Sequence, residues 1–255
     1  MKPNFSFIIP VYNEQNRIAG SLNKILQWIK ENNFLDVNLI IVNDGSLDKT
    51  KDIVQNFKHT NKINIEIIDQ EHIGQFQAIL NGIYNCKSKY GFILEADLSA
   101  GTEYFNIMLK HLDSADVICG TRYSNQSKIY NKPIYRDIIS KIFNFLFRIM
   151  FKIQITDPQF SFRVYNVEKF KLCSKEFICQ NDGMKSTELI LNFAAMNFSI
   201  KEIPLNYNFI ESTRNISKSS ALKVVLDCAY NMFLIWSKFR KNYNDSNYIN
   251  KVTRF

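Results

Sequence analysis

Short apolar runs of strand length alternate with amphipathic helical patterns through the first 120 residues, and this alternation constrains the fold more than any other feature. Most runs lack the apolar–polar alternation of a half-exposed strand, which is typical of strands buried on both faces. Helical patterns such as Ile18–Lys30 separate them. The order predicts an α/β fold with a mostly parallel, Rossmann-like sheet flanked by helices. The expected strands are Phe5–Ile9, Leu39–Val42, Ile63–Ile68, Phe92–Leu94 and Val117–Cys119.

Polar clusters follow three of these runs at the point where each expected strand ends. They are Tyr12–Glu14, Asp44–Ser46 and Asp97–Ser99. Ligands of open parallel sheets bind outside the carboxyl ends of the strands. We therefore expect the three clusters to line one crevice.

Glu95 and Asp97 are the candidate metal ligands. Residues two apart on an extended segment face the same way, and two carboxylates can hold a hard divalent cation while nucleotide phosphates complete its shell. A solvated acidic loop is the alternative, and the buried-type strand before Glu95 favours the metal site.

Asp44 is the candidate nucleobase ligand. Ordinary turn and capping preferences explain Gly45 and Asp48 but not Asp44, which can accept an N–H from a nucleobase.

Charge divides the chain into two unequal halves. Residues 1–125 carry a net charge of −2 and residues 126–255 a net charge of +10. The basic half indicates a phosphate-bearing partner, which could be a nucleic acid, an anionic membrane or a charged substrate. No helix-turn-helix, zinc or RNA-binding signature is present, so we do not expect nucleic acid. A nucleotidyltransferase would need a glycine- and lysine-rich phosphate loop near its start, and the chain has none.

Two segments of the basic half, Arg136–Lys152 and Ala221–Phe239, predict C-terminal amphipathic helices with a narrow polar stripe. Such a helix lies in a membrane interface or packs as a core helix under the sheet. Arg148 and Lys152 on the stripe favour the membrane slightly. No stretch has the ~20 apolar residues of a spanning helix, and no secretory signal is apparent. Five scattered cysteines without a CxxC pair indicate reduced thiols in a cytosolic protein.

The ordered combination of Pro10–Glu14, Asn43–Ser46 and Glu95–Ser99 resembles the opening of the family 2 glycosyltransferases, whose fold is the nucleotide-sugar-binding GT-A fold. The similarity covers roughly residues 5 to 240. Further stretches resemble the subgroup that glycosylates dolichyl or polyprenyl phosphate: Ile73–Gln75 with Ala78 and Gly82, Gly120–Tyr123, Arg136, Asp157–Gln159, Phe162 with Arg163, and Ser217 with Lys218.

The resemblance implies site residues by position. Those assigned to the nucleoside of a UDP- or GDP-sugar are Pro10, Tyr12, Glu14 and Asp44; those assigned to Mg²⁺ or Mn²⁺ and the diphosphate are Glu95 and Asp97. Arg122, Arg136 and Arg163 would hold phosphates, with Arg136 on the acceptor side and Arg122 or Arg163 on the donor side. Lys218, in a mobile C-terminal loop, would help to close the site.

This chain also departs from the family pattern. Glu95 stands where the family usually has Asp, which leaves the metal preference open. Asn43 replaces the first of two usual aspartates, and His72 stands where the bacterial subgroup tends to have Arg or Asn.

The resemblance implies an inverting hexosyltransferase that moves a sugar to a polyprenyl or dolichyl phosphate, peripheral on the cytoplasmic face of a membrane. A phosphate monoester has a second pKa near ~6, so it needs placement and charge balance more than a general base. Clustered arginines fit that need. The alternative is a family 2 enzyme acting on a sugar hydroxyl of a polysaccharide or glycoconjugate, with Asp157 as the residue to examine.

We therefore expect a single domain over residues 1–240. Its nucleotide-sugar-binding half would span 1–125 and its acceptor- and membrane-facing half 126–240, followed by a polar tail, 241–255. A homo-oligomer is left open.

Overall fold

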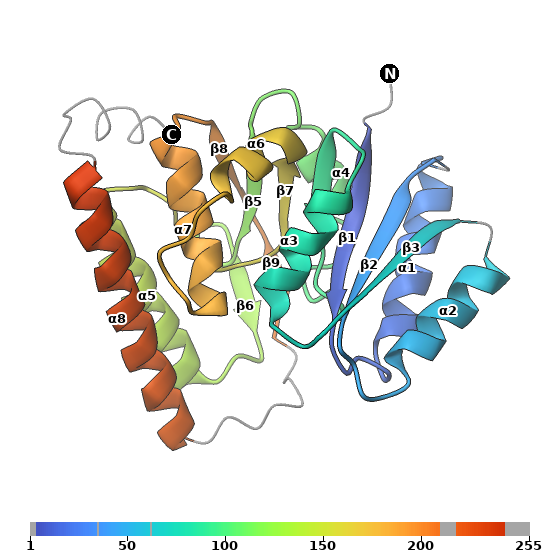
Figure 1. The fold of residues 1–255 in the computed structure, drawn as a ribbon, viewed down its shortest axis with the longest axis horizontal. Helices are drawn as coiled ribbons and strands as arrows, with labels where there is room; N and C mark the ends of the chain where they lie inside the picture. The colour runs from blue at the N-terminus through green and yellow to red at the C-terminus, as the bar shows by residue number, and fades with distance from the viewer. Residues whose placement is uncertain (1–3, 35, 62, 210–217, 243–255) are drawn as a thin grey trace.

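The computed structural model describes residues 4–34, 36–61, 63–209 and 218–242, and a seven-stranded sheet runs through its centre (Figure 1). The strand order is β3-β2-β1-β4-β7-β5-β8. Every neighbouring pair is parallel except the two that involve β7, which runs antiparallel to β4 and β5. The strands are β1 (Phe5–Val11), β2 (Asn38–Asp44), β3 (Asn64–Gln70), β4 (Tyr90–Ile93), β5 (Val117–Thr121), β7 (Arg163–Asn166) and β8 (Ile200–Pro204).

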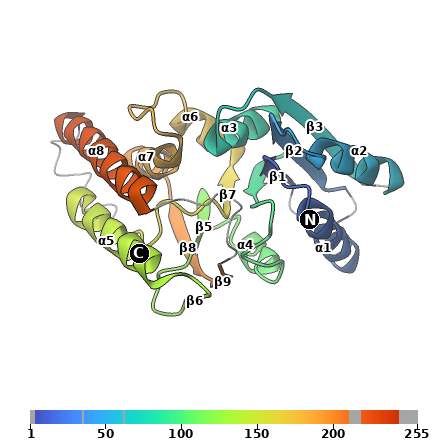
Figure 2. The same ribbon diagram turned by 90° about the horizontal axis from the view of Figure 1, so that it is seen from below.

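Helices cover both faces of the sheet and bury a hydrophobic cluster on each (Figure 2). One face carries α1 and α4, whose Trp28 and Phe105 pack on Phe7 and Phe92 of the central strands. The other face carries α3, α6 and α7. The helices are α1 (Ile18–Glu31), α2 (Thr50–Thr60), α3 (Gln75–Asn85), α4 (Phe105–Leu109), α5 (Ile134–Phe151), α6 (Val167–Cys173), α7 (Asp182–Ala195) and α8 (Lys218–Asn242).

The predicted α/β fold is confirmed, and the five expected strands are β1 to β5. The strand at Ile63–Ile68 differs from expectation, because β3 forms an edge of the sheet and leaves Asn64, Glu66 and Asp69 exposed. The sequence did not predict β7 or its insertion between β4 and β5. A separate two-stranded parallel sheet joins β6 (Lys128–Tyr130) to β9 (Asn206–Asn208).

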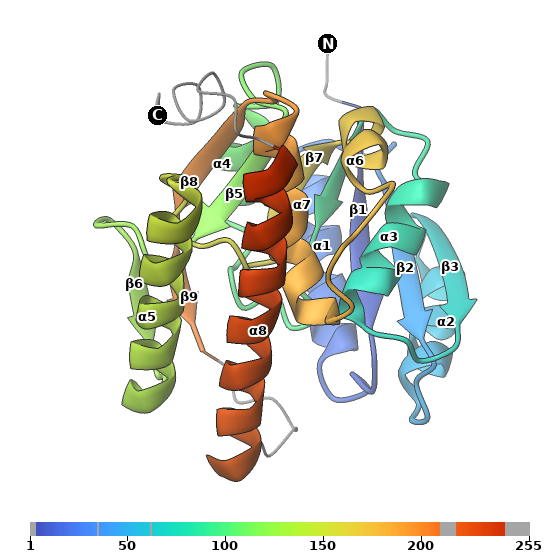
Figure 3. The same cartoon turned by 60° about the vertical axis from the view of Figure 1, so that its left-hand side comes forward.

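Helices α5 and α8 lie side by side at one end of the molecule (Figure 3). Phe147 of α5 and Met232 of α8 anchor the pair to the cluster under α7. Most of the remaining apolar surface of α5 faces outward; Ile134 is 79% exposed and Ile149 is 58% exposed. The core-helix interpretation of this segment is therefore wrong for most of α5. None of the described helices has the length and apolarity needed to cross a bilayer.

All five cysteines are free, and four of them are buried. Residues 210–217, the side chain of Lys218 and residues 243–255 lie outside the described residues, and with them the predicted closing loop and most of the predicted polar tail. Lys218 itself is the first residue of α8.

Candidate active site

A cavity of about 710 Å³, here called the acidic pocket, opens at the carboxyl ends of β1, β2 and β4. These strands are neighbours and run parallel, so the segments that follow them meet at one edge of the sheet. The structure brings together here the three clusters expected to converge. Six residues that the sequence assigned to the nucleoside, the metal and the diphosphate line the pocket, and Arg136, assigned to the acceptor, lines it as well. The six are Pro10, Tyr12, Glu14, Asp44, Glu95 and Asp97.

Asp44 organises one end of the acidic pocket. Its carboxylate is buried, and both of its oxygens accept hydrogen bonds from the segment that follows β3. The donors are Gln70 Nε2 at 2.7 Å, His72 Nδ1 at 2.8 Å, and the backbone N–H groups of Ile73 at 3.0 Å and Gly74 at 3.1 Å. The direct contact from Asp44 to a nucleobase, expected from the sequence, is not available while these bonds are made.

The surface presented beside Asp44 is aromatic. The His72 ring stacks on the Tyr12 ring with centroids 3.8 Å apart and planes 10° from parallel, and both residues line the pocket. From the sequence, His72 stood out only as a departure from the family pattern. Its polar position two residues after β3, next to Ile73–Gln75, was the signal that could have assigned it to the site.

Glu95 and Asp97 lie at another part of the same pocket. Glu95 Oε1 accepts from Ser161 Oγ at 3.0 Å, whereas Oε2 is buried and has no hydrogen-bond partner among the described residues. Burial, and then the charge of Asp97, raise the pKa of Glu95 to about 7. An orphaned buried carboxylate oxygen is unfavourable unless a ligand satisfies it. The pair therefore fits a hard cation that binds through oxygen.

The charges that line the acidic pocket do not balance. Among its described residues, two guanidinium groups, those of Arg17 and Arg136, face five carboxylates. Arg17 is already paired with Glu14 at 2.7 Å. The carboxylates are those of Glu14, Asp44, Glu95, Asp97 and Asp182. A diphosphate entering this pocket needs an added cation to offset the acidic charge.

Asp182 is a pocket residue that sequence analysis missed. It begins α7, and its carboxylate accepts the backbone N–H of Phe76 at 2.9 Å and that of Gln77 at 3.3 Å. These are N–H groups of the first turn of α3, which otherwise lack an intrahelical partner. Asp182 therefore caps α3 from a distant part of the chain and holds α7 against the pocket.

A second cavity of about 420 Å³, here called the helix groove, runs between α5 and α8. Three cations, those of Arg122, Lys132 and Arg136, line it together with an apolar wall, and none of its described lining residues is a carboxylate. The apolar wall includes Ile139, Ile142, Phe143, Leu146, Val225 and Met232. Arg136 and Phe209 line both the groove and the acidic pocket, so the two cavities adjoin.

Arg136 stands at that junction in the first turn of α5. Its Nε donates to the Tyr135 hydroxyl at 3.1 Å, and its guanidinium carbon lies 5.5 Å from the centre of the Phe209 ring. Within the described part of the chain it forms no ion pair with a carboxylate. Arg136 is thus a half-buried cation that faces both cavities without a counter-charge.

Arg122 and Asp157 form a buried pair. Arg122 donates from Nε to Asp157 Oδ2 at 2.7 Å and from Nη2 to Oδ1 at 3.0 Å, and its guanidinium lies 4.2 Å from the Phe160 ring centre. Asp157 is 1% exposed. Both carboxylate oxygens accept from Arg122, so a role of Asp157 toward a hydroxyl acceptor stays a prediction that this pairing does not favour. Arg122 lines the helix groove, and not the donor side where it was one of two candidates.

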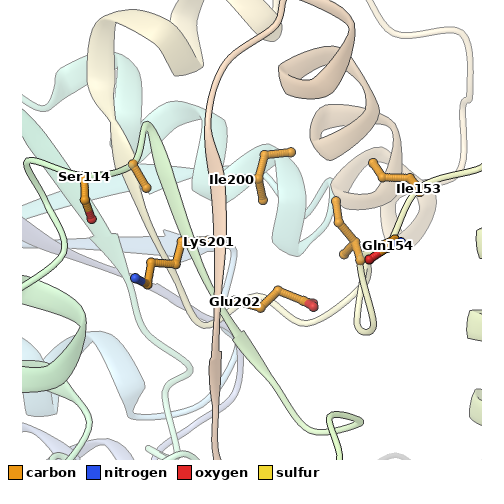
Figure 4. A pocket seen from close by; sticks show the side chains of 8 residues that line it. Ser114, Ile153, Gln154, Ile200, Lys201 and Glu202 are labelled. Carbon is orange, nitrogen blue, oxygen red and sulfur yellow. The ribbon is translucent and has the colours of Figure 1, made fainter. Parts of the chain in front are cut away.

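Glu202 supports that pair from a further cavity of about 420 Å³ beside β8 (Figure 4). Its carboxylate accepts the backbone N–H of Thr156 at 2.9 Å and that of Asp157 at 3.2 Å. No residue predicted for the site lines this cavity. Glu202 acts on the site only indirectly, because it holds the loop that presents Asp157 to Arg122.

Arg163 does not hold a phosphate in this structure. It is 1% exposed and donates to the carbonyl oxygens of Pro158 at 2.6 Å and Ser186 at 3.3 Å, and to the Tyr165 hydroxyl at 3.1 Å. Arg163 lines neither the acidic pocket nor the helix groove, so the phosphate role implied by the resemblance stays a prediction that this placement does not support. It ties the loop before β7 to α7.

Solved glycosyltransferases share this fold. Glucosyl-3-phosphoglycerate synthase from Mycobacterium tuberculosis, solved with Mn²⁺, UDP and glucosyl-3-phosphoglycerate, superposes with a TM-score of 0.67 at 14% identity, covering 92% of this chain and 80% of that one. A mannosyltransferase from Pyrobaculum calidifontis, solved with GDP-Man and Mn²⁺, gives 0.65 at 14% identity over 99% and 68%. The fold is the GT-A glycosyltransferase fold.

The family model described as Glycosyl transferase family 2 matches residues 6–173, more than half of the chain, and the protein belongs to that family. Two dolichyl-phosphate beta-glucosyltransferases of Trichomonas vaginalis are 24% and 25% identical over 237 residues, 87% of this chain and 71% of each relative. One from Dictyostelium discoideum is 23% identical over 235 residues, 87% and 72%. The family predicted from the sequence is confirmed.

Proposed function

We propose that this glycosyltransferase is an inverting hexosyltransferase that moves a sugar from a nucleotide-sugar to a polyprenyl or dolichyl phosphate at a membrane surface. The observation that carries the proposal is the helix groove, whose apolar wall and three cations adjoin the acidic pocket through Arg136. The dolichyl-phosphate glucosyltransferase relatives support the acceptor class.

The acidic pocket takes the donor. The Tyr12–His72 stack offers a surface for the nucleobase of a UDP- or GDP-sugar, and Glu95 with Asp97 would hold Mg²⁺ or Mn²⁺. Neighbours solved with Mn²⁺ and either UDP or GDP-Man support a divalent ion and both nucleotide classes. When bound, the ion supplies charge neutralisation of the leaving nucleoside diphosphate.

The helix groove takes the acceptor. An isoprenoid chain fits its apolar wall, and the phosphate of that lipid fits its cationic end. The phosphate is anionic at neutral pH, so its oxygen attacks the anomeric carbon without a general base. The new carbon–oxygen bond forms as the bond to the diphosphate breaks on the opposite side, and the electron pair leaves with the nucleoside diphosphate.

The outward face of α5 and α8 would lie on the membrane. Ile138, Ile142 and Phe145 of α5 continue the exposed apolar face, and Leu226 and Phe233 of α8 extend it. A contiguous apolar patch of this kind marks an interaction surface, and basic residues beside it favour an anionic membrane. The free thiols fit a reducing compartment, which supports the cytoplasmic face.

The test is transfer to a lipid phosphate. The purified protein is incubated with Mn²⁺, polyprenyl phosphate in liposomes and a panel of labelled nucleotide-sugars. A labelled, phosphate-containing lipid is expected with one or a few donors, and none when polyprenol replaces the phosphate. Equal labelling of polyprenol, or label that enters only a polysaccharide hydroxyl, would contradict the proposal.

A further inference from the structure

Lys132 is one of the three cations among the described lining residues of the helix groove, and no sequence motif assigned it to the site. It lies just before α5, is half-buried, and lines both the groove and an adjoining cavity of about 350 Å³. Its ammonium donates to the hydroxyl of Tyr123 and to Ser140 Oγ at 2.8 Å. Among the described residues no carboxylate lies within 4 Å of it.

The acids that act on Lys132 are Asp137 and Asp157, and neither contacts it. Asp157 is paired with Arg122, and Asp137 pairs with Lys141 at 2.7 Å through Oδ2, while its buried Oδ1 has no hydrogen-bond partner among the described residues. The positive groups that face Lys132 are Arg122 and Lys141, and its hydrogen-bond partners on Tyr123 and Ser140 are neutral hydroxyls. A half-buried ammonium is therefore held beside a guanidinium with no carboxylate in contact.

This arrangement disfavours the charged form of the lysine. Burial, and then the charge of Arg122, lower the pKa of Lys132 to about 8. A protein that holds a cation in such a place stabilises it when an anion binds there. The anion belongs in the helix groove, because the adjoining cavity that Lys132 also lines contains the Asp137 carboxylate, whereas none of the groove's described lining residues is a carboxylate.

We propose that Lys132 binds the phosphate of the acceptor lipid together with Arg136, which makes it a positioning residue for the attacking oxygen. The proposal rests on the proposed lipid-phosphate acceptor. Arg122 is neutralised by Asp157, so among the described residues of the groove Lys132 and Arg136 are the cations left to balance a doubly charged phosphate monoester. The chemistry recognised is a phosphate monoester, and the diphosphate of the donor is the competing source.

The proposal has a pH signature. Below pH 8 the free enzyme presents the ammonium, and above it the ammonium is lost, while the phosphate stays doubly charged throughout. The KM for polyprenyl phosphate should therefore rise by up to about tenfold between pH 7 and pH 9, the factor expected one unit above the pKa of a group that must be protonated for binding. Lys132→Arg should remove that rise, because a guanidinium keeps its charge.

The experiment compares Lys132→Met, Lys132→Arg and the control Lys128→Met, an exposed lysine of β6. The measurements are kcat and KM for polyprenyl phosphate and for the donor, and UDP and GDP affinity by calorimetry. Lys132→Met should raise the acceptor KM at least about tenfold, the worth of one hydrogen bond to a charged group. Donor KM and nucleotide affinity should change less than about twofold, as should every constant of Lys128→Met.

The possible results distinguish a failure of the role of Lys132 from a failure of the proposed function. If the wild-type enzyme does not label polyprenyl phosphate, the proposed function is wrong and this inference goes with it. If the wild-type enzyme does so but Lys132→Met keeps the wild-type acceptor KM, the role of Lys132 alone is wrong. An equal rise in donor KM would place Lys132 on the donor diphosphate. Should Lys132→Met fail to fold, the pH profiles of wild type and Lys132→Arg still decide, and identical profiles would overturn the proposal.

Discussion

The acidic pocket and the helix groove adjoin, yet they carry opposite charge. Among the described lining residues the pocket has five carboxylates against two guanidinium groups, whereas the groove has three cations and no carboxylate. The same contrast is visible along the chain, where the first half is slightly acidic and the second half strongly basic. We therefore expect the donor diphosphate to be bound through an added cation and the acceptor phosphate to be bound by the chain's own side chains.

The scaffolds of the two sites differ as well. The pocket is built on strand ends in the centre of the sheet, where neighbouring backbone bonds fix each segment. The groove lies between two helices, with much of their apolar surface exposed. A rigid polar site suits a soluble charged donor, and an apolar groove open to an exposed hydrophobic face suits a lipid.

Removal of the Asp97 carboxylate is the strongest test of the contrast between the acidic pocket and the helix groove. Asp97→Ala should lower transfer by about 10²–10³-fold or more, because the pocket loses a ligand for the cation that offsets the diphosphate charge. EDTA should do the same, and added Mn²⁺ should reverse the effect of EDTA only. Turnover is measured with labelled donor, and thermal melting should match wild type and the exposed-site control Asp113→Ala. Near-normal turnover in Asp97→Ala would remove the cation requirement.

The groove is tested next through Arg136. Arg136→Ala should lower kcat/KM for polyprenyl phosphate by about 10- to 100-fold, the worth of one or two hydrogen bonds to a charged group, and should affect nucleotide affinity much less. Arg136→Lys should recover only part, since an ammonium cannot make a bidentate contact. Kinetics with both substrates varied decide the point. Because Arg136 lines both cavities, an equal loss for donor and acceptor would refute the acceptor assignment.

Within the acidic pocket, Asp44 and His72 should have unequal effects. Asp44→Ala should weaken nucleotide binding by about 1.5–3 kcal/mol, because it releases the segment 70–74 that Asp44 holds. His72→Ala removes one ring and should weaken binding by about 0.5–1.5 kcal/mol. Calorimetry with UDP and GDP measures both. If Asp44→Ala keeps the wild-type affinity for both nucleotides, this end of the pocket does not bind the nucleobase.

The smallest expected effect on catalysis concerns the exposed face of α5. Phe145→Ser should weaken binding to anionic liposomes by about 1 kcal/mol, because Phe145 is 55% exposed and only that part of its side chain can be newly buried, while activity toward a short-chain, detergent-dispersed acceptor should change little. Leu47→Ser is the matched control, because Leu47 is 90% exposed in the loop after β2. Cosedimentation of protein with liposomes is the measurement. Equal binding of Phe145→Ser and wild type would argue against this face as the membrane contact.

Local patterns in the sequence predicted most of the sheet and the donor side. Apolar runs and helical periodicity identified β1 to β5 and the cores of α1, α5 and α8 within a few residues. The acidic clusters met in one pocket because parallel strands end at a common edge, a rule that needs only strand order. His72 was noticed but not assigned, since its stacking on Tyr12 joins segments 60 residues apart.

The cationic residues of the site show what the sequence alone could not determine. Sequence and resemblance treated Arg122, Arg136 and Arg163 alike as phosphate ligands, and the tertiary structure separated them. Arg163 is buried against backbone carbonyls, Arg122 is neutralised by Asp157, and Arg136 faces both cavities without a carboxylate partner. Lys132 gained a comparable position without any motif. The order of strands and helices follows from short-range periodicity, but whether a charge is free to bind a ligand depends on which distant atoms neutralise it, and only the folded chain decides that.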